Sequence, residues 1–463
     1  MDDYTLVKNG TIITDTATYK ADILIKDGKI ECIGVSIPET HCKKVIDATG
    51  LYVLPGAIDG HTHLAMPFGG TISADDYEAG TRAAACGGTT TVFDFAIQNT
   101  GELLGDTLKR RDALASVQAC VDYAFHIAIK DISTKPLLDS VETAVESGVT
   151  SFKIFMVYDF FVNDGQFYTI LKKTKECGAL LGVHAENREI INTLIAEFKE
   201  ENHMTPYYHY LSRPEFVEEE ADQRAIAIAK STKAPLYIVH LANKGGVKAL
   251  EEARKEGYPI FAETCIQYLE MTSDVYKRDD AIKYVCSPPM KGKESQAALW
   301  DALKRGVIST VATDHCPFQL SEKHWGDKDF TKIPNGCAGV ENMFPYMLSK
   351  ANEGVLPFTK VVEVCCVNPA KLFGLYPQKG ALCVGSDADF VLYDPHKAFE
   401  VSVKNMHSNV DHTIWEGLKL KGYPKEVYSR GNLVFKEGEF VGKKGDGKRL
   451  ICKKIKFTGP SLE

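Results

Sequence analysis

A regular alternation of short apolar segments with segments of helical periodicity runs from about residue 52 to residue 313 and constrains the fold of this chain more than any other feature. Eight of the apolar segments have the length and composition of buried strands. The expected strands are 54–59, 89–95, 121–129, 151–156, 180–184, 236–240, 259–264 and 308–313. Eight consecutive βα units are typical of an α/β fold of the (β/α)8 TIM-like barrel type.

Helical periodicity fills the intervals between these strands. The clearest helices are expected at 75–86, 136–146, 188–199, 215–231, 246–255 and 294–304. A doubly wound open sheet is the alternative fold, although it seldom needs so many strands in a row. No GxGxxG sequence follows a predicted strand, so a dinucleotide site is not indicated.

The two ends of the chain are β-rich. Strands are expected at 4–13, 21–26, 29–35, 389–393, 426–429 and 433–436. We therefore expect residues 1–52 and 376–463 to form one small β-sandwich domain beside a barrel at 53–375. The Gly- and Lys-rich tail after about residue 440 is expected to be a surface extension or an arm onto a neighbouring subunit.

Charge and composition exclude several classes of protein. The 54 basic and 62 acidic side chains give a net charge of -8, which disfavours nucleic-acid binding. No apolar run is long enough to cross a membrane. The N-terminus, MDDY, lacks the basic and apolar regions of a signal peptide. Together with 13 scattered cysteines and no CxxC, these features predict a cytoplasmic protein with reduced thiols.

Two histidines stand two positions apart where the first barrel strand ends, in DGHTH at 59–63. Side chains alternate along a strand, so His61 and His63 point to the same side. They could therefore share one metal ion of the zinc type. The alternative is a pair of histidines in a polar loop, because so short a motif often occurs by chance.

Further reactive side chains fall at the ends of later strands, where the active sites of barrel enzymes lie. They are Lys153 in the fourth strand, His184 after the fifth, His240 after the sixth and Asp314 after the eighth. These positions predict one metal site at the mouth of the barrel. His126, inside an apolar strand, is expected to be a core residue, and His315, His324 and His412 are expected at the surface or behind the site.

A charged Lys153 would be costly to bury, since its neighbours Phe152 and Ile154 place it in an apolar strand. A depressed pKa would resolve the conflict. Carbamylation by CO2 would also do so, because it converts the amine into a carboxylate that could bridge two metals. A side chain that extends to solvent is the third explanation.

The motifs, taken together, resemble the cyclic amidases of the amidohydrolase superfamily, above all the dihydropyrimidinase and D-hydantoinase group. The matching segments are 59–63, 151–158 (SFKIFMVY), 183–187 (VHAEN), 238–240, 286–289 (CSPP), 312–316 (ATDHC), 333–336 (IPNG), 368–374 (NPAKLFG) and 385–389 (GSDAD). The resemblance implies a hydrolase that opens dihydropyrimidines such as dihydrouracil, and hydantoins, to N-carbamoyl amino acids.

The resemblance also implies two divalent metal ions, usually zinc, and a hydroxide formed between them. The ligands would be His61, His63 and Asp314 for the more buried ion, His184 and His240 for the other, and Lys153, as N6-carboxylysine, for both. Asp314 would accept the proton of the attacking water and pass it to the leaving nitrogen.

Substrate contacts follow from the same resemblance. Tyr158 would stabilise the oxyanion, while Ser287 and Asn335 would hold the amide edge of the substrate through main-chain contacts. The loop 64–70, with Phe155 and Phe160, would shape the wall that faces the ring substituent.

Three related possibilities bear on the substrate and the assembly. Ala65 replaces the polar or acidic residue expected on the loop, which leaves the substituent preference open. No arginine follows the HxH motif, so a dihydroorotase is disfavoured. An allantoinase is the closer alternative, and a non-catalytic assembly protein is disfavoured by the complete ligand set. The resemblance further implies a homotetramer whose only other partner is a small cyclic amide.

Overall fold

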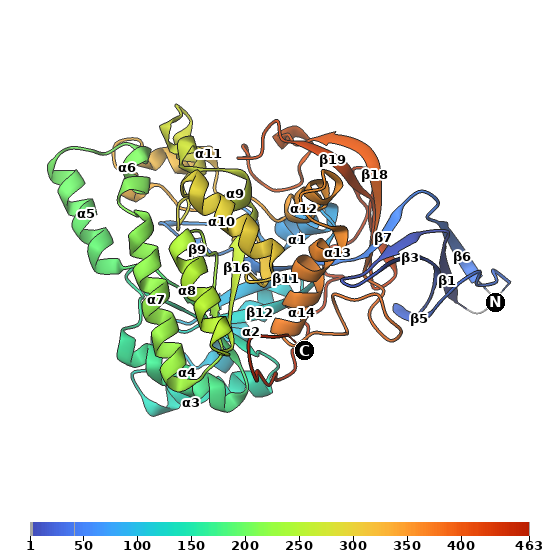
Figure 1. Ribbon diagram of the computed structural model, residues 1–463, viewed down its shortest axis with the longest axis horizontal. Coiled ribbons are helices and arrows are strands. Elements are labelled where there is room, and N and C mark those ends of the chain that lie inside the picture. The colour runs from blue at the N-terminus through green and yellow to red at the C-terminus, as the bar shows by residue number, and fades with distance from the viewer. Residues whose placement is uncertain (1–2, 41, 463) are drawn as a thin grey trace.

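The computed structural model describes residues 3–40 and 42–462 (Figure 1). Met1 and Asp2, the first residues of the MDDY segment that was compared with a signal peptide, lie outside the described residues. Eight parallel strands lie in sequence order around one sheet. They are β8 (Ala57–Thr62), β11 (Thr89–Ile97), β12 (Asp122–Ala128), β13 (Ser151–Phe155), β14 (Leu180–His184), β15 (Leu236–Ile238), β16 (Ile260–Cys265) and β17 (Thr310–Ala312). The predicted (β/α)8 barrel is confirmed, and the open sheet is wrong.

The first and last strands close the barrel at their carboxyl ends. The backbone N–H of His63 donates to the carbonyl of His315 at 2.8 Å, and the N–H of His315 donates to the carbonyl of His61 at 3.3 Å. Thr62 and His315 form the corresponding parallel bridge. Closure therefore occurs at the HxH motif itself and brings it beside Asp314.

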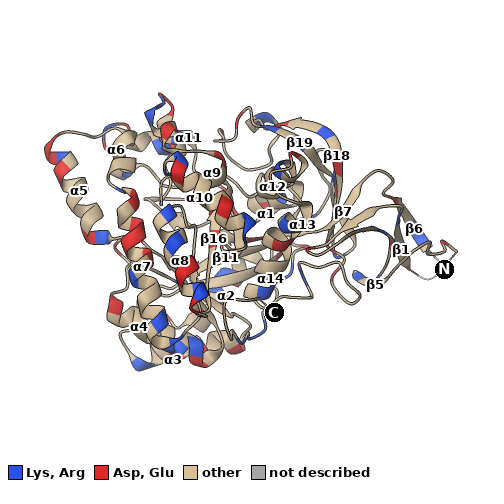
Figure 2. Ribbon diagram, viewed as in Figure 1, with Lys and Arg blue, Asp and Glu red and all other residues tan. Residues whose placement is uncertain are grey.

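Helices surround the barrel. The longer ones are α1 (Tyr77–Cys86), α2 (Leu104–Ala115), α3 (Lys135–Glu146), α4 (Asp164–Cys177), α5 (Arg188–Glu200), α7 (Glu215–Thr232), α8 (Lys244–Lys255), α10 (Lys293–Lys304) and α12 (Met343–Asn352). Acidic and basic residues both lie along the outer helices, for example along α7 and α8 (Figure 2). None of the described helices is long and apolar enough to cross a membrane.

Short elements lie mainly at the carboxyl ends of the barrel strands and after the barrel. They are the helices α6 (Pro206–Leu211), α9 (Ile266–Glu270), α11 (Leu320–Lys323), α13 (Phe358–Val362) and α14 (Asn368–Leu372), the 3-10 turns η1 (Ser273–Lys277), η2 (Ala281–Tyr284), η3 (His324–Gly326), η4 (Phe330–Lys332) and η6 (Val403–Asn405), the π-helical turn η5 (Glu363–Val367), and the hairpin β9 (Pro67–Phe68) and β10 (Thr71–Ile72).

Strands from both ends of the chain form two further sheets beside the barrel (Figure 1). One contains β1 (Tyr4–Lys8), β4 (Asp22–Lys26), β5 (Lys29–Gly34) and β6 (Cys42–Asp47). The other contains β2 (Thr11–Ile13), β3 (Thr18–Lys20), β7 (Tyr52–Pro55), β18 (Phe390–Glu400), β19 (Lys419–Ser429), β20 (Asn432–Lys436) and β21 (Glu439–Phe440). The antiparallel pairing of β7 with β18 joins the two ends, while the domain boundaries at 52 and 376 stay a prediction.

A buried lysine connects these sheets to the barrel. Lys379 Nζ lies 2.6 Å from a carboxylate oxygen of Asp122, 2.7 Å from one of Asp389 and 3.1 Å from one of Asp387. Asp122 begins β12, whereas Asp387 and Asp389 belong to GSDAD at 385–389. The three carboxylates raise the pKa of Lys379. The motif is therefore a structural connection and lies away from the barrel mouth.

The C-terminal tail packs beneath the chain's own barrel. The N–H of Leu450 donates to the carbonyl of Tyr123, and the N–H of Cys452 donates to that of Gly148, at the amino ends of β12 and β13. The side chains of Leu450 and Cys452 join the apolar cluster that fills this end of the barrel, together with Phe373. This part of the tail thus belongs to the barrel floor and is not a free surface extension, while an arm onto a neighbouring subunit stays a prediction.

Lys379→Met should destabilise the protein by about 3–5 kcal/mol, because the substitution leaves buried carboxylates without their cation. Chemical unfolding followed by circular dichroism would measure the change. Lys425→Met is the matched control, since Lys425 forms an exposed pair with Glu437 at 4.0 Å and should cost less than about 1 kcal/mol. Equal effects of the two substitutions would contradict the role given to Lys379.

Candidate metal centre

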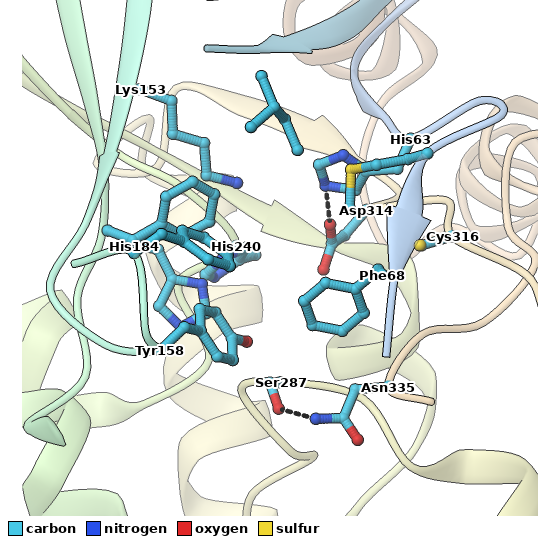
Figure 3. Close-up of a pocket in the computed structure, with 14 residues that line it drawn as sticks. His63, Phe68, Lys153, Tyr158, His184, His240, Ser287, Asp314, Cys316 and Asn335 are labelled. Carbon is cyan, nitrogen blue, oxygen red and sulfur yellow. Dashed lines mark hydrogen bonds and ion pairs between the residues drawn. The ribbon is translucent and has the colours of Figure 1, made fainter. Parts of the chain in front are cut away.

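All nine predicted site residues meet at the carboxyl ends of the barrel strands. A cavity of about 470 Å³ opens there (Figure 3). It is lined by His63, Met66, Phe68, Ile97, Lys153, Phe155, Tyr158, Phe160, His184, His240, Ser287, Asp314, Cys316 and Asn335. His61 lies directly behind this lining and is fully buried.

His61, His63 and Asp314 form one half of the site. Asp314 Oδ1 lies 3.1 Å from His61 Nε2 and 3.0 Å from His63 Nε2. Burial lowers the pKa of both histidines, so the imidazoles are neutral, which is the form that binds metals. His61 Nδ1 donates to the Glu263 carboxylate, which leaves the Nε2 lone pair facing Asp314. Three donor atoms that converge in this way fit a divalent cation.

Lys153 approaches the same point from β13. Its Nζ lies 2.9 Å from His61 Nε2 and 4.4 Å from the centre of the Phe95 ring. The side chain is buried, so the expectation that it could extend to solvent is wrong. Burial lowers the pKa of Lys153 to about 8, which makes the neutral amine available near neutral pH. This state is the one that reacts with CO2, and carbamylation stays a prediction.

His184 and His240 form the other half, with ring centres 4.5 Å apart. The Nε2 of His184 donates to Glu186 at 2.7 Å, which leaves Nδ1 as the ring nitrogen available as a ligand. The backbone N–H of His240 donates to Glu263 at 3.0 Å. Burial lowers the pKa of both histidines, so this pair is also in the neutral form.

Tyr158, Ser287 and Asn335 lie across the cavity from the lysine (Figure 3). The Tyr158 ring is 5.2 Å from that of His184, and burial raises the pKa of its hydroxyl, which therefore stays a hydrogen-bond donor. The Asn335 side-chain amide donates to Ser287 Oγ at 3.0 Å.

Three of these residues have an unusual backbone conformation. The φ angles are +72° at Tyr158, +40° at His240 and +52° at Asp314. Side chains other than glycine seldom adopt this region, and such strain is concentrated at functional sites. The surrounding contacts therefore fix these residues in position at an energetic cost.

Comparison with known proteins gives the site its family context. The model of the amidohydrolase family matches residues 52–434. The chain belongs to the amidohydrolase family. A D-hydantoinase from Streptomyces coelicolor is 42% identical over 456 residues, which cover 96% of this chain and 97% of that protein. A D-hydantoinase from Geobacillus stearothermophilus is 43% identical over 448 residues, covering 96% and 95%.

Solved structures agree with the sequence comparison. The crystal structure of dihydropyrimidinase from Brevibacillus agri NCHU1002 superposes with a TM-score of 0.96 at 40% identity, covering 98% of this chain and 100% of that chain. The resemblance to the dihydropyrimidinase and D-hydantoinase group, predicted from the motifs, is thus confirmed. Amidohydrolases are metal-dependent, and the group of His61, His63 and Asp314 in this chain could hold a metal ion.

Sequence reasoning missed the carboxylates behind the histidines of this amidohydrolase. Glu263 and Glu186 are both fully buried, and each accepts a hydrogen bond from a histidine of the site. Glu263 follows the apolar run IFA in the seventh strand, so a charge in a buried strand was the available signal. His126 is a core residue, as expected, because its ring nitrogens contact Ser151 Oγ at 2.5 Å and the carbonyl of Gly60 at 3.0 Å.

His315 lies directly behind the site, which was one of its two expected positions. It is buried, its Nε2 lies 2.8 Å from Asp75, and its Nδ1 accepts the backbone N–H of Gly339. Because it follows Asp314 in the chain, these contacts fix the backbone that carries the aspartate.

Lys153→Ala should lower the affinity for zinc by more than about 100-fold, because a bridging ligand would be lost. Loss of a residue that only hydrogen-bonds to a ligand has a smaller effect. Zinc binding would be measured by competition with a chromophoric chelator. Lys172→Ala, an exposed position on α4, is the control. Unchanged zinc affinity in Lys153→Ala would show that the lysine is not a ligand.

Proposed function

We propose that this protein is a metal-dependent hydrolase that opens the rings of cyclic amides and ureides. Its substrates would be 5,6-dihydropyrimidines such as dihydrouracil, and hydantoins, and its products N-carbamoyl amino acids. The observation that carries the proposal is the convergence of four histidines, Lys153 and Asp314 on one cavity in a chain whose relatives are named D-hydantoinase and dihydropyrimidinase.

We propose that the site holds two zinc ions. His61, His63 and Asp314 would hold one ion, His184 and His240 the other, and a CO2-derived carbamate on Lys153 would bridge them. The two ions, when bound, lower the pKa of water at the site and polarise the substrate carbonyl. The neutral histidines and the buried lysine of lowered pKa support this arrangement.

The position of Asp314 supports a role as the proton carrier. Its side chain lies between His61 and His63 on one side and the cavity on the other. The carboxylate would accept the proton of the attacking water and deliver it to the ring nitrogen as the amide bond breaks. The same residue thereby acts first as a general base and then as a general acid.

Tyr158, Ser287 and Asn335 would orient the substrate. The protonated Tyr158 hydroxyl would donate to the carbonyl oxygen as negative charge develops on it. Ser287 and Asn335 would hold the amide edge of the ring through main-chain contacts, and their mutual hydrogen bond supports this by fixing the two loops together.

The wall of the cavity favours apolar ring substituents. Five of its side chains are aromatic or aliphatic: Met66, Phe68, Ile97, Phe155 and Phe160. Among the residues that line the cavity none is an arginine, so a carboxylated ring such as dihydroorotate would lack an arginine partner for its carboxylate. Ala65, which was expected to influence this preference, is not part of the lining. The homotetramer and the cytoplasmic location remain predictions.

A substrate panel on zinc-loaded protein tests the proposal. Ring opening of dihydrouracil, hydantoin, 5-phenylhydantoin, allantoin and dihydroorotate would be followed, with a chelated sample as the blank. We expect chelator-sensitive opening of dihydrouracil and the hydantoins, and none of dihydroorotate. Opening of allantoin alone would make the protein an allantoinase, and silence on every ring in fully loaded protein would contradict the proposal.

Tyr158→Phe should lower kcat by about 100-fold or more, because one donor to the developing oxyanion is lost. Zinc content should not change, since the tyrosine is not assigned as a ligand. Tyr168→Phe, an exposed position on α4, is the matched control. Loss of zinc in Tyr158→Phe would instead mean that the residue supports the metal centre.

A further inference from the structure

We propose that a buried ion pair between Glu186 and Arg213, extended by Lys291 and Glu218, positions the residues that hold the second ion. The inference rests on the proposed two-ion function and assigns roles to four residues that do not line the cavity of the metal centre. They act through His184, through Tyr158 and through the loop that follows His240.

Glu186 is the member that contacts a ligand. A single oxygen, Oε2, accepts from His184 Nε2 at 2.7 Å and from Arg213 at 2.6 Å. Glu186 is fully buried and Arg213 is 6% exposed, so this pair lies in a region of low polarity. The carboxylate fixes the ring of His184 with Nδ1 free, and the hydrogen bond from Arg213 holds the carboxylate in place.

Arg213 connects this carboxylate to the oxyanion donor. Its guanidinium lies 5.9 Å from the centre of the Tyr158 ring. The Tyr158 ring also stacks on Phe160, with ring centres 5.5 Å apart, so it contacts both a cation and an aromatic side chain. A residue with a φ of +72° needs such support, because its backbone is intrinsically strained.

The second part of the network reaches the loop after His240. Lys291 Nζ donates to the backbone carbonyl of Arg213 at 2.9 Å and lies 3.4 Å from Glu218. The other oxygen of Glu218 accepts the backbone N–H of Ala242 at 2.8 Å, two residues beyond His240. One chain of contacts therefore runs from the side chain of His184 to the backbone that carries His240.

The location of the network explains why it would act on one ion. Arg213 lies in the turn between α6 and α7, and Glu218 lies in the first turn of α7, so both are outside the barrel strands. The residues assigned to the other ion are instead supported from within the barrel, where Glu263 contacts His61 and Thr313 donates to Asp59 at 2.6 Å. Glu263 also accepts the backbone N–H of His240, so this carboxylate supports both halves of the site.

Zinc stoichiometry and affinity in variants of the pair test the inference. Glu186→Ala and Arg213→Met should each lower the affinity for one of the two zinc ions by about 10–100-fold. The affinity for the other ion should not change. Competition with a chromophoric chelator resolves the two ions, and thermal melting reports the fold. Arg213→Lys should restore part of the lost affinity, because it keeps a cation beside Glu186. Glu186→Gln serves if the alanine variant fails to fold, and it should weaken the same ion.

Arg224→Met is the matched control for Arg213→Met. Arg224 lies on α7, and its side chain pairs with Glu220 and Asp164 at a partly exposed position away from the cavity. Wild-type affinity for both ions in Glu186→Gln and Arg213→Met would overturn the inference, as would an equal loss of both ions. A wild-type protein that holds a single ion would overturn it as well. Two bound ions without ring opening would overturn only the proposed function.

Discussion

The backbone hydrogen bonds that close the barrel between β8 and β17 are the constraint on which the site depends. They join His63 to His315 and His315 to His61, so closure and assembly of the first ligand group are one event. Asp314 is then held beside two imidazoles by the register of the barrel. Asp314 Oδ1 lies 3.1 Å from His61 Nε2 and 3.0 Å from His63 Nε2, so the register of the barrel organises these three donor atoms in advance.

The sequence predicted the barrel and the inner face of the site because both depend on local rules. The period of two in a strand placed His61 with His63, and the convergence of strand ends placed His184, His240 and Asp314 together. The supporting contacts obey no such rule. Arg213 reaches Glu186 from the turn between α6 and α7, two helices after β14. The direction of such a turn is decided by packing that a single sequence does not display.

Buried charge has two different uses in this fold. Lys379 gathers carboxylates from β12 and from the GSDAD motif and thereby attaches one part of the chain to another. Glu186 and Arg213 instead fix the orientation of a ring beside the cavity. In both cases the geometry is determined because an ion in a region of low polarity has few acceptable positions. A motif that the chain shares with its family can therefore have a purely structural role, as GSDAD does.

The tail beneath the barrel has a consequence for the order of folding. Leu450 and Cys452 complete the floor of a barrel whose eighth strand ends at Ala312, so a ribosome exposes all eight strands well before it synthesises the segment that covers their amino ends. Until that segment is synthesised, Leu450 and Cys452 cannot cover the apolar cluster that contains Phe373. The floor of the barrel can therefore be completed only after residues 450–452 have been made.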